Sequence, residues 1–257
     1  MELFLQIDTW IALLTLTFLE IILGIDNIIF ISISANKLPK EQQKKATFLG
    51  LSLAMIARIL LLFSVSYLIA LKDPFWTIQT SWMYAGITGQ SIILFLGGLF
   101  LLYKSTREIH HKMEQSINNI DSAPKKTSTF SNVIIQIILI DIVFSFDSIL
   151  TAVGMTNGID GALIIMVIAV LISMIIMMVF ANTVSTFVNN NPTIQMLALS
   201  FLILIGFMLI AEGAHLSHLE IFKQSVGVIP KGYLYFAIAF SLGVEVLNMK
   251  IRKKKKS

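Results

Sequence analysis

The chain consists of long apolar segments separated by short polar ones. A transmembrane helix needs roughly 20 mainly apolar residues, and seven segments approach or reach that length. Residues 161–211 carry no charge at all, and Asn189 to Pro192 is the expected break within that stretch. The pattern predicts an all-α, multi-pass membrane protein. The expected spans are residues 9–34, 46–71, 82–103, 130–155, 161–186, 194–212 and 232–249.

Composition excludes most soluble classes of protein. Apolar residues make up 56% of the chain and charged residues only 13%, whereas a globular chain is about 25% charged. Because so few charged residues cannot cover the surface of a soluble protein of this size, we expect the chain to be surrounded mainly by the lipid bilayer. The chain has no cysteine, which excludes thiolate metal sites and cysteine nucleophiles. No nucleophile–base pair and no Walker loop stands out, so we expect neither an enzyme nor a bound cofactor.

The basic residues predict the orientation of the chain in the membrane. Fifteen of the 19 Lys and Arg residues lie in segments 35–45, 104–129 and 250–257, which share one side if there are seven spans. Three lie on the opposite side, and Arg58 falls inside a span. The positive-inside rule then places the N-terminus outside and the C-terminus in the cytoplasm. Since topology accounts for the positive charge, no nucleic-acid partner is expected.

The first and fourth spans contain the same acidic motif. Each has an acid, five mostly apolar residues, a second acid and a small polar residue. The third and sixth spans also correspond, because each has a glycine six residues before a charged residue. The matched pairs are Glu20 with Asp141, Asp26 with Asp147, Asn27 with Ser148, Gly98 with Gly206 and Lys104 with Glu212.

This correspondence predicts two inverted three-helix repeats plus a seventh helix, because an odd number of spans turns the second copy over. That plan is typical of secondary transporters, whose site lies near the midplane between the repeats. The expected divisions are a first repeat at 1–103, a cytoplasmic polar linker at 104–129, a second repeat at 130–213, and an outer loop, seventh helix and basic tail at 214–257.

Carboxylates inside the spans are the candidate functional groups. An ionised group in hydrocarbon costs several kcal/mol, and four acids lie well inside spans. One of them can form an ion pair with Arg58, but the excess of negative charge favours a cation or protons as the substrate. Oxygen ligands suit hard divalent cations such as Mg²⁺, Ca²⁺ and Mn²⁺. The predicted metal ligands are Glu20, Asp26, Asn27, Asp141, Asp147 and Ser148, with Arg58, Glu212 and Glu245 as counter-charges or coupling groups.

Helical spacing leaves two arrangements of these acids open. Residues four and seven positions apart share a face of a helix, so each first acid is aligned with two small or polar residues. The second acid lies six positions on, about 120° around the helix and roughly 9 Å along it. Either the helix opens near Gly24 so that one ion meets both acids, or each acid serves a different position along a path. The expected stripes are Glu20, Gly24 and Asn27 on one helix and Asp141, Ser145 and Ser148 on the other.

At these motifs the chain resembles the TerC family of integral membrane proteins, named for tellurium resistance. The resemblance includes Glu20 to Asn27, Asp141 to Gly154, Glu212 to His215 and Ile229 to Glu245. It implies a seven-span bacterial protein within the wider superfamily of LysE-type exporters. The understood members of the TerC family look like manganese exporters. It also implies that the family's transport acids are Glu20, Asp26, Asp141 and Asp147.

We therefore expect a secondary transporter that exports a divalent cation in exchange for protons, and Mn²⁺ is the favoured substrate. One alternative is a non-transporting partner in membrane-protein insertion or in metal loading of secreted metalloenzymes, associated with the translocation machinery. Another is a LysE-like exporter of cationic amino acids. A metal-capture site at Glu212, His215 and His218 is a weaker hypothesis, because a spacing of three used twice drifts around a helix.

Overall fold

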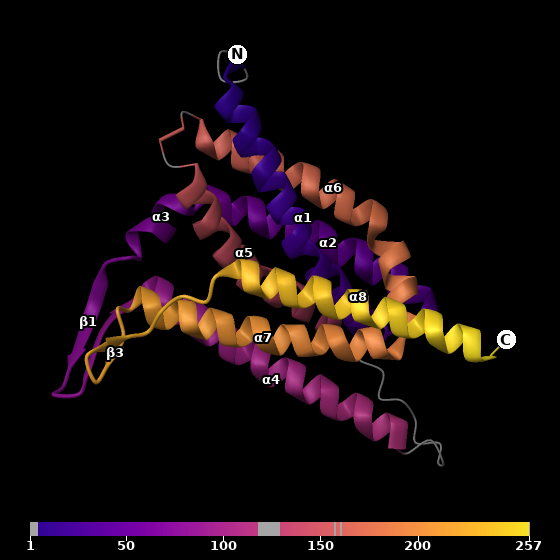
Figure 1. The fold of residues 1–257 in the computed structure, drawn as a ribbon. Helices are drawn as coiled ribbons and strands as arrows, with labels where there is room; N and C mark the ends of the chain where they lie inside the picture. Colours follow the sequence, from indigo (N-terminus) through magenta and orange to yellow (C-terminus); the bar gives the residue numbers. More distant parts are fainter. Residues whose placement is uncertain (1–4, 118–128, 157, 160, 257) are drawn as a thin grey trace. The chain divides into compact units, whose positions relative to one another are not determined.

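The structure is a computed structural model that describes residues 5–117, 129–156, 158–159 and 161–256, without the side chains of residues 25–26, 66, 115–117 and 253–256. Long helices dominate it, and one small sheet accompanies them (Figure 1). The elements in chain order are α1 (Ile7–Ala35), α2 (Lys40–Phe63), α3 (Val65–Ala70), β1 (Pro74–Gln79), β2 (Met83–Thr88), α4 (Gly89–Ile117), α5 (Phe130–Met155), α6 (Ala162–Asn189), α7 (Pro192–Leu216), β3 (Glu220–Ile221), β4 (Gln224–Ser225) and α8 (Lys231–Lys256).

The chain forms two compact units that alternate along the sequence. The first comprises residues 1–71 and 125–189, and the second comprises residues 72–124 and 190–257. In the first unit α1 packs mainly on α6, and α2 packs mainly on α5. In the second unit α4 packs along α7, and Figure 1 shows these two helices side by side. In the predicted repeats α1 corresponds to α5 and α2 corresponds to α6, so the packed pair α1–α6 corresponds to the packed pair α2–α5. The inverted relation of the repeats itself stays a prediction.

Six of the described helices are long and apolar enough to cross a membrane, namely α1, α2, α5, α6, α7 and α8. A helical membrane protein is therefore the observed class, while the count of seven spans is not confirmed. The expected third span differs most, because residues 83–88 form strand β2 and the helix begins only at Gly89. This helix continues to Ile117, so the first half of the expected polar linker is helical.

The start of α4 is set by a reciprocal cap. The backbone N–H of Ser91 donates to Thr88 Oγ1 at 3.0 Å, and the N–H of Thr88 donates to Ser91 Oγ at 3.1 Å. Such a pair satisfies two donors at a helix start, as in a capping box. The chain therefore turns from strand to helix between these two residues.

The sheet belongs to the second unit and has the order β1-β2-β3-β4, with every neighbouring pair antiparallel. The turn between β3 and β4 is made by Phe222 and Lys223, which both have positive φ. This conformation normally favours glycine or asparagine. Phe222 is held there by its N–H, which donates to the Trp82 carbonyl at 2.7 Å, and by the contact of its ring with the Trp82 ring.

The expected break in the long uncharged stretch is confirmed. Helix α6 ends at Asn189, and α7 begins at Pro192. Proline suits the first turn of a helix, because the N–H it lacks would have no partner within the helix there. The polar run before Pro192 thus separates two helices of nearly equal length.

Helix α1 is continuous from Ile7 to Ala35, so it does not open near Gly24. Gly24 instead faces the Met177 side chain of α6. A Cβ placed on Gly24 would lie 2.0 Å from Sδ of Met177, far inside contact distance. The absence of a side chain at Gly24 therefore leaves room for the Met177 side chain, one helical turn from Glu20.

We expect Gly24→Ala to destabilise the protein by about 1–3 kcal/mol, the usual cost of overpacking a well-filled core. Because the obstacle is a side chain and not backbone, Gly24→Ala should cost little further stability in a protein that already carries Met177→Ala. Thermal unfolding of the detergent-purified single and double variants measures this coupling. Strictly additive effects of the two substitutions would contradict it.

Candidate functional site

A buried arginine joins the first acids of the two motifs. Arg58, in the second half of α2, is only 2% exposed. Its Nη1 donates to Oε2 of Glu20. Its Nη2 donates to Oδ1 of Asp141 at 2.7 Å, and its Nε donates to Oδ2 of the same carboxylate at 3.2 Å. One guanidinium therefore bridges carboxylates from α1 and α5.

Small residues on α2 bring the arginine within reach of α5. Gly50, Ala54 and Arg58 are spaced by four, share a face of the helix and are all buried. A Cβ on Gly50 would lie 3.0 Å from the side chain of Ile137, which precedes Asp141 by one turn of α5. The lack of a side chain at Gly50 leaves room for Ile137, and on the same face of α2 the Arg58 side chain meets Asp141 with two donors.

Asp141 accepts hydrogen bonds from three different residues. Besides Arg58, Asn27 Nδ2 donates to its Oδ1 at 3.2 Å, and Ser145 Oγ donates to its Oδ2 at 3.1 Å. The two polar stripes expected from helical spacing therefore meet around this carboxylate. With both acids ionised, the cluster of Glu20, Asp141 and Arg58 carries one net negative charge.

Of the second acids of the two motifs, Asp26 and Asp147, the structure describes only the side chain of Asp147. Asp147 is buried on α5, as is Ser148, whose hydroxyl donates to the Ser145 carbonyl at 3.2 Å. The side chain of Asp26 lies outside the described residues. Within the described part of the chain, no three acidic or histidine side chains are grouped closely enough to hold a metal ion. The guanidinium of Arg58 forms ion pairs with both Glu20 and Asp141.

The remaining candidate residues belong to the second unit. Glu212 lies near the end of α7, and Glu245 lies on α8, where its Oε2 accepts from Asn248 Nδ2 at 3.4 Å. His215 Nδ1 lies 3.2 Å from the Val226 carbonyl oxygen, and His218 follows the end of α7. The structure thus divides the predicted site between two units, and only the first unit contains the Arg58 cluster.

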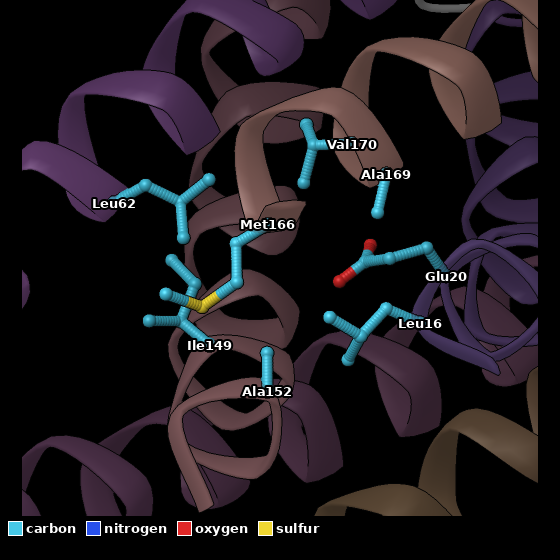
Figure 2. Close-up of a pocket in the computed structure, with 8 residues that line it drawn as sticks. All are labelled: Leu16, Glu20, Leu62, Ile149, Ala152, Met166, Ala169 and Val170. Atoms are coloured by element: carbon cyan, nitrogen blue, oxygen red, sulfur yellow. The ribbon is translucent and has the colours of Figure 1, made fainter. Parts of the chain in front are cut away.

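An apolar layer adjoins the Arg58 cluster on one side. A cavity of about 10 Å³ there is at the lower limit of what holds one water molecule. Figure 2 shows the Glu20 carboxylate pointing into it, and all the other lining residues are apolar. Leu16 lies one turn before Glu20, and Leu62 lies one turn after Arg58, so the layer faces the end at which α1 begins. The lining is completed by Ile149, Ala152, Met166, Ala169 and Val170.

A neutral polar network lies at the other end of α1. Ser32 Oγ contacts Ser185 Oγ at 2.9 Å and donates to Asn189 Oδ1 at 3.1 Å, while Asn36 Nδ2 donates to the same oxygen. These residues join the end of α1 to the end of α6. Along α1 the first unit therefore presents an apolar layer, a charged cluster and then a polar network.

The sequence interpretation did not single out this network. Asn189 was noted only as part of a helix break, yet Ser185 lies one turn before it on the same face of α6. A serine and an asparagine spaced by four at the end of an otherwise apolar helix are the signal that could have indicated it. Ser32 and Asn36 repeat the same spacing on α1.

Long apolar helices around buried charges define the class of this molecule as a multi-pass helical membrane protein. The chain belongs to the TerC family of integral membrane proteins, whose family model matches residues 5–257. The resemblance found in the motifs is therefore confirmed over nearly the whole sequence.

Two relatives from well-known bacteria match the chain end to end. The UPF0053 inner membrane protein YgdQ of Escherichia coli is 44% identical over 248 residues, covering 96% of this chain and 95% of the relative. A UPF0053 protein of Haemophilus influenzae is 42% identical over 246 residues, with the same two shares.

A longer relative contains the same segment as part of a larger chain. The UPF0053 inner membrane protein YoaE of Escherichia coli is 42% identical over 253 residues, which cover 98% of this chain but 45% of the relative. No solved structure matches the chain. Membership in the family and an inner-membrane location of the relatives are thus shown, while the orientation of the termini stays a prediction.

Proposed function

We propose that this protein is a secondary transporter that exports a hard divalent cation, with Glu20 and Asp141 as its central ligands and Asp26 and Asp147 as further acids on the same transport path. The observation that carries the proposal is the convergence of two buried carboxylates, from α1 and α5, on one positive charge. Ionisable residues inside a membrane are costly and rare, and they commonly mark substrate or ion pathways. Because the two acids come from corresponding positions of the two motifs, they would lie at the interface between the repeats.

Manganese is the substrate that we propose first. Glu20 and Asp141 offer carboxylate oxygens, and Asn27 and Ser145 offer an amide and a hydroxyl oxygen beside them. This set of donors suits Mg²⁺, Ca²⁺ and Mn²⁺ alike. The resemblance to the manganese exporters of the family favours Mn²⁺ among them.

The layers along α1 support a direction for the path. The positive-inside prediction puts the network of Ser32, Asn36 and Asn189 toward the cytoplasm and the apolar cavity toward the outside. A cation would arrive through the polar network, bind at the central carboxylates and leave when the apolar layer opens. Exchange against protons is the proposed source of energy, because carboxylates also bind protons and the chain has no Walker loop.

Overproduction of the protein is expected to lower intracellular manganese under manganese load, and Asp26→Ala and Asp147→Ala are each expected to abolish that effect. Elemental analysis of cells that lack or overproduce the protein measures the change. Asp8→Ala, at an exposed position in the first turn of α1, is the matched control and should export normally.

Full manganese export by both Asp26→Ala and Asp147→Ala would contradict the transport proposal. No change with the wild-type protein would first direct the test to other divalent cations. If none of them responds, the partner in protein insertion or metal loading becomes the better hypothesis. That hypothesis predicts co-purification with the translocation machinery that is unaffected by the acid-to-alanine changes.

A further inference from the structure

We infer that Arg58 is a tethered competitor of the transported cation: it occupies Glu20 and Asp141 when no substrate is bound, and it must leave them for a cation to bind. The inference rests on the proposed transport function and adds a step to it. Its starting point is that the two central ligands already hold a cation, which the chain itself supplies.

The contacts of Asp141 show why the site is blocked. Each oxygen of this carboxylate accepts at least two donors: Oδ1 accepts from Arg58 Nη2 and Asn27 Nδ2, Oδ2 accepts from Ser145 Oγ, and Arg58 Nε is shared between the two oxygens at 3.3 and 3.2 Å. A metal ion needs the same lone pairs. Because a guanidinium and a divalent cation are both positive, they cannot share this carboxylate at close range, so one excludes the other.

Burial makes the exchange depend on a conformational change. The cavity beside Glu20 is about water-sized, so the guanidinium of Arg58 has no room to swing into it. Arg58 is also closely surrounded, with 2% of its surface exposed. Displacing it therefore requires α2 to move relative to α1 and α5. Cation binding and opening of the first unit would then be one event.

The charges explain what the competitor contributes to transport. With Arg58 in place the cluster has a net charge of one minus. With a divalent cation in its place the two carboxylates are neutralised, and the displaced guanidinium, which stays charged, must be solvated as the first unit opens. If neither the Arg58 guanidinium nor a cation were bound, two unpaired carboxylates would remain in the membrane, which is energetically costly. Arg58 thus allows the empty carrier to return without a proton on these two acids, which leaves proton coupling to the other intramembrane carboxylates.

The test uses the purified full-length protein in liposomes and compares wild type with Arg58→Gln. Equilibrium binding of Mn²⁺ is measured by titration calorimetry, and radioactive manganese reports net efflux and manganese-for-manganese exchange separately. If the open state is about one tenth of the wild-type population, removing the competitor should tighten the apparent Kd about tenfold. Exchange should persist, whereas net efflux should fall at least tenfold, because the empty variant cannot return.

Arg107→Gln is the matched control, since Arg107 is an exposed arginine on α4 that donates to the Tyr103 hydroxyl. It should leave Kd, exchange and net efflux unchanged. Folded Arg58→Gln protein that binds Mn²⁺ no more tightly than wild type, or that retains wild-type net efflux, would overturn the inference. Wild-type protein that neither binds nor moves manganese would instead contradict the proposed function.

Arg58→Lys keeps the inference testable if the glutamine variant does not fold. Lysine retains the charge but replaces the planar fork with a single point charge, so it is a weaker competitor for Asp141. We expect tighter Mn²⁺ binding than in wild type together with preserved net efflux. Binding equal to or weaker than that of wild type would count against competition.

Discussion

Asp141→Asn is expected to reduce net manganese efflux from liposomes about a hundredfold or more, to the level of protein-free vesicles. Residues that merely orient a metal ligand typically contribute 10- to 100-fold in metal affinity, and Asp141 is proposed as a ligand. Asparagine has nearly the same volume as aspartate but no charge. Its NH₂ group, which donates, replaces one of the two carboxylate oxygens that accept from Arg58. The variant therefore weakens the cation site and disturbs the contacts with Ser145 and Asn27 as well.

Asp8→Asn is the control for this substitution, because it makes the same chemical change at an exposed position on the same protein. It should transport as wild type does. Thermal unfolding of both variants in detergent separates loss of transport from loss of fold. Efflux above half of the wild-type rate in folded Asp141→Asn protein would remove this residue from the proposed site.

Gly98→Val is expected to disrupt the second unit, with a loss of stability of about 3 kcal/mol or more, at the upper end of overpacking costs. A Cβ on Gly98 would lie 2.6 Å from the Gly206 carbonyl oxygen and 3.1 Å from the backbone nitrogen of Ile210. These obstacles are backbone atoms, which no change of rotamer can move. The helices α4 and α7 would have to separate along their contact, and the unfolding midpoint should fall accordingly.

Gly243→Val on α8 is the matched control, because a Cβ at that position meets nothing within 4 Å. Its unfolding midpoint should stay close to that of the wild type. A Gly98→Val protein that unfolds at the wild-type midpoint would show that α4 and α7 do not pack through their glycines. The comparison also separates the loss of glycine flexibility from the loss of close packing.

The sequence was enough to predict which residues make up the candidate site, but not which acids Arg58 contacts. Helical spacing aligned Glu20 with Asn27 and Asp141 with Ser145, and the structure brings both sets together. Arg58 was recognised only as a counter-charge. Which acid it contacts depends on how α2 packs between its neighbours. The small residues Gly50 and Ala54 permit that packing but do not specify the partner helix.

The small sheet was missed for two physical reasons. The run from Met83 to Thr88 is apolar and continuous with the helix after it, and a short apolar run does not distinguish a strand from a helix. The turn at Phe222 and Lys223 lacks the glycine or asparagine that usually marks a tight hairpin. Contacts with Trp82 hold this turn, and a contact of that kind leaves no local signature.

The amino-acid sequence by itself determined that this protein lies in a membrane, which family it belongs to, where most of its helices begin and end, and which acids lie inside them. These properties follow from local hydropathy, charge and chain-breaking residues such as Pro192. Only the tertiary structure decided that Arg58 joins Glu20, 38 positions away, to Asp141, 83 positions away. The physical reason is that such contacts depend on the packing of whole helices, which no local pattern of residues encodes.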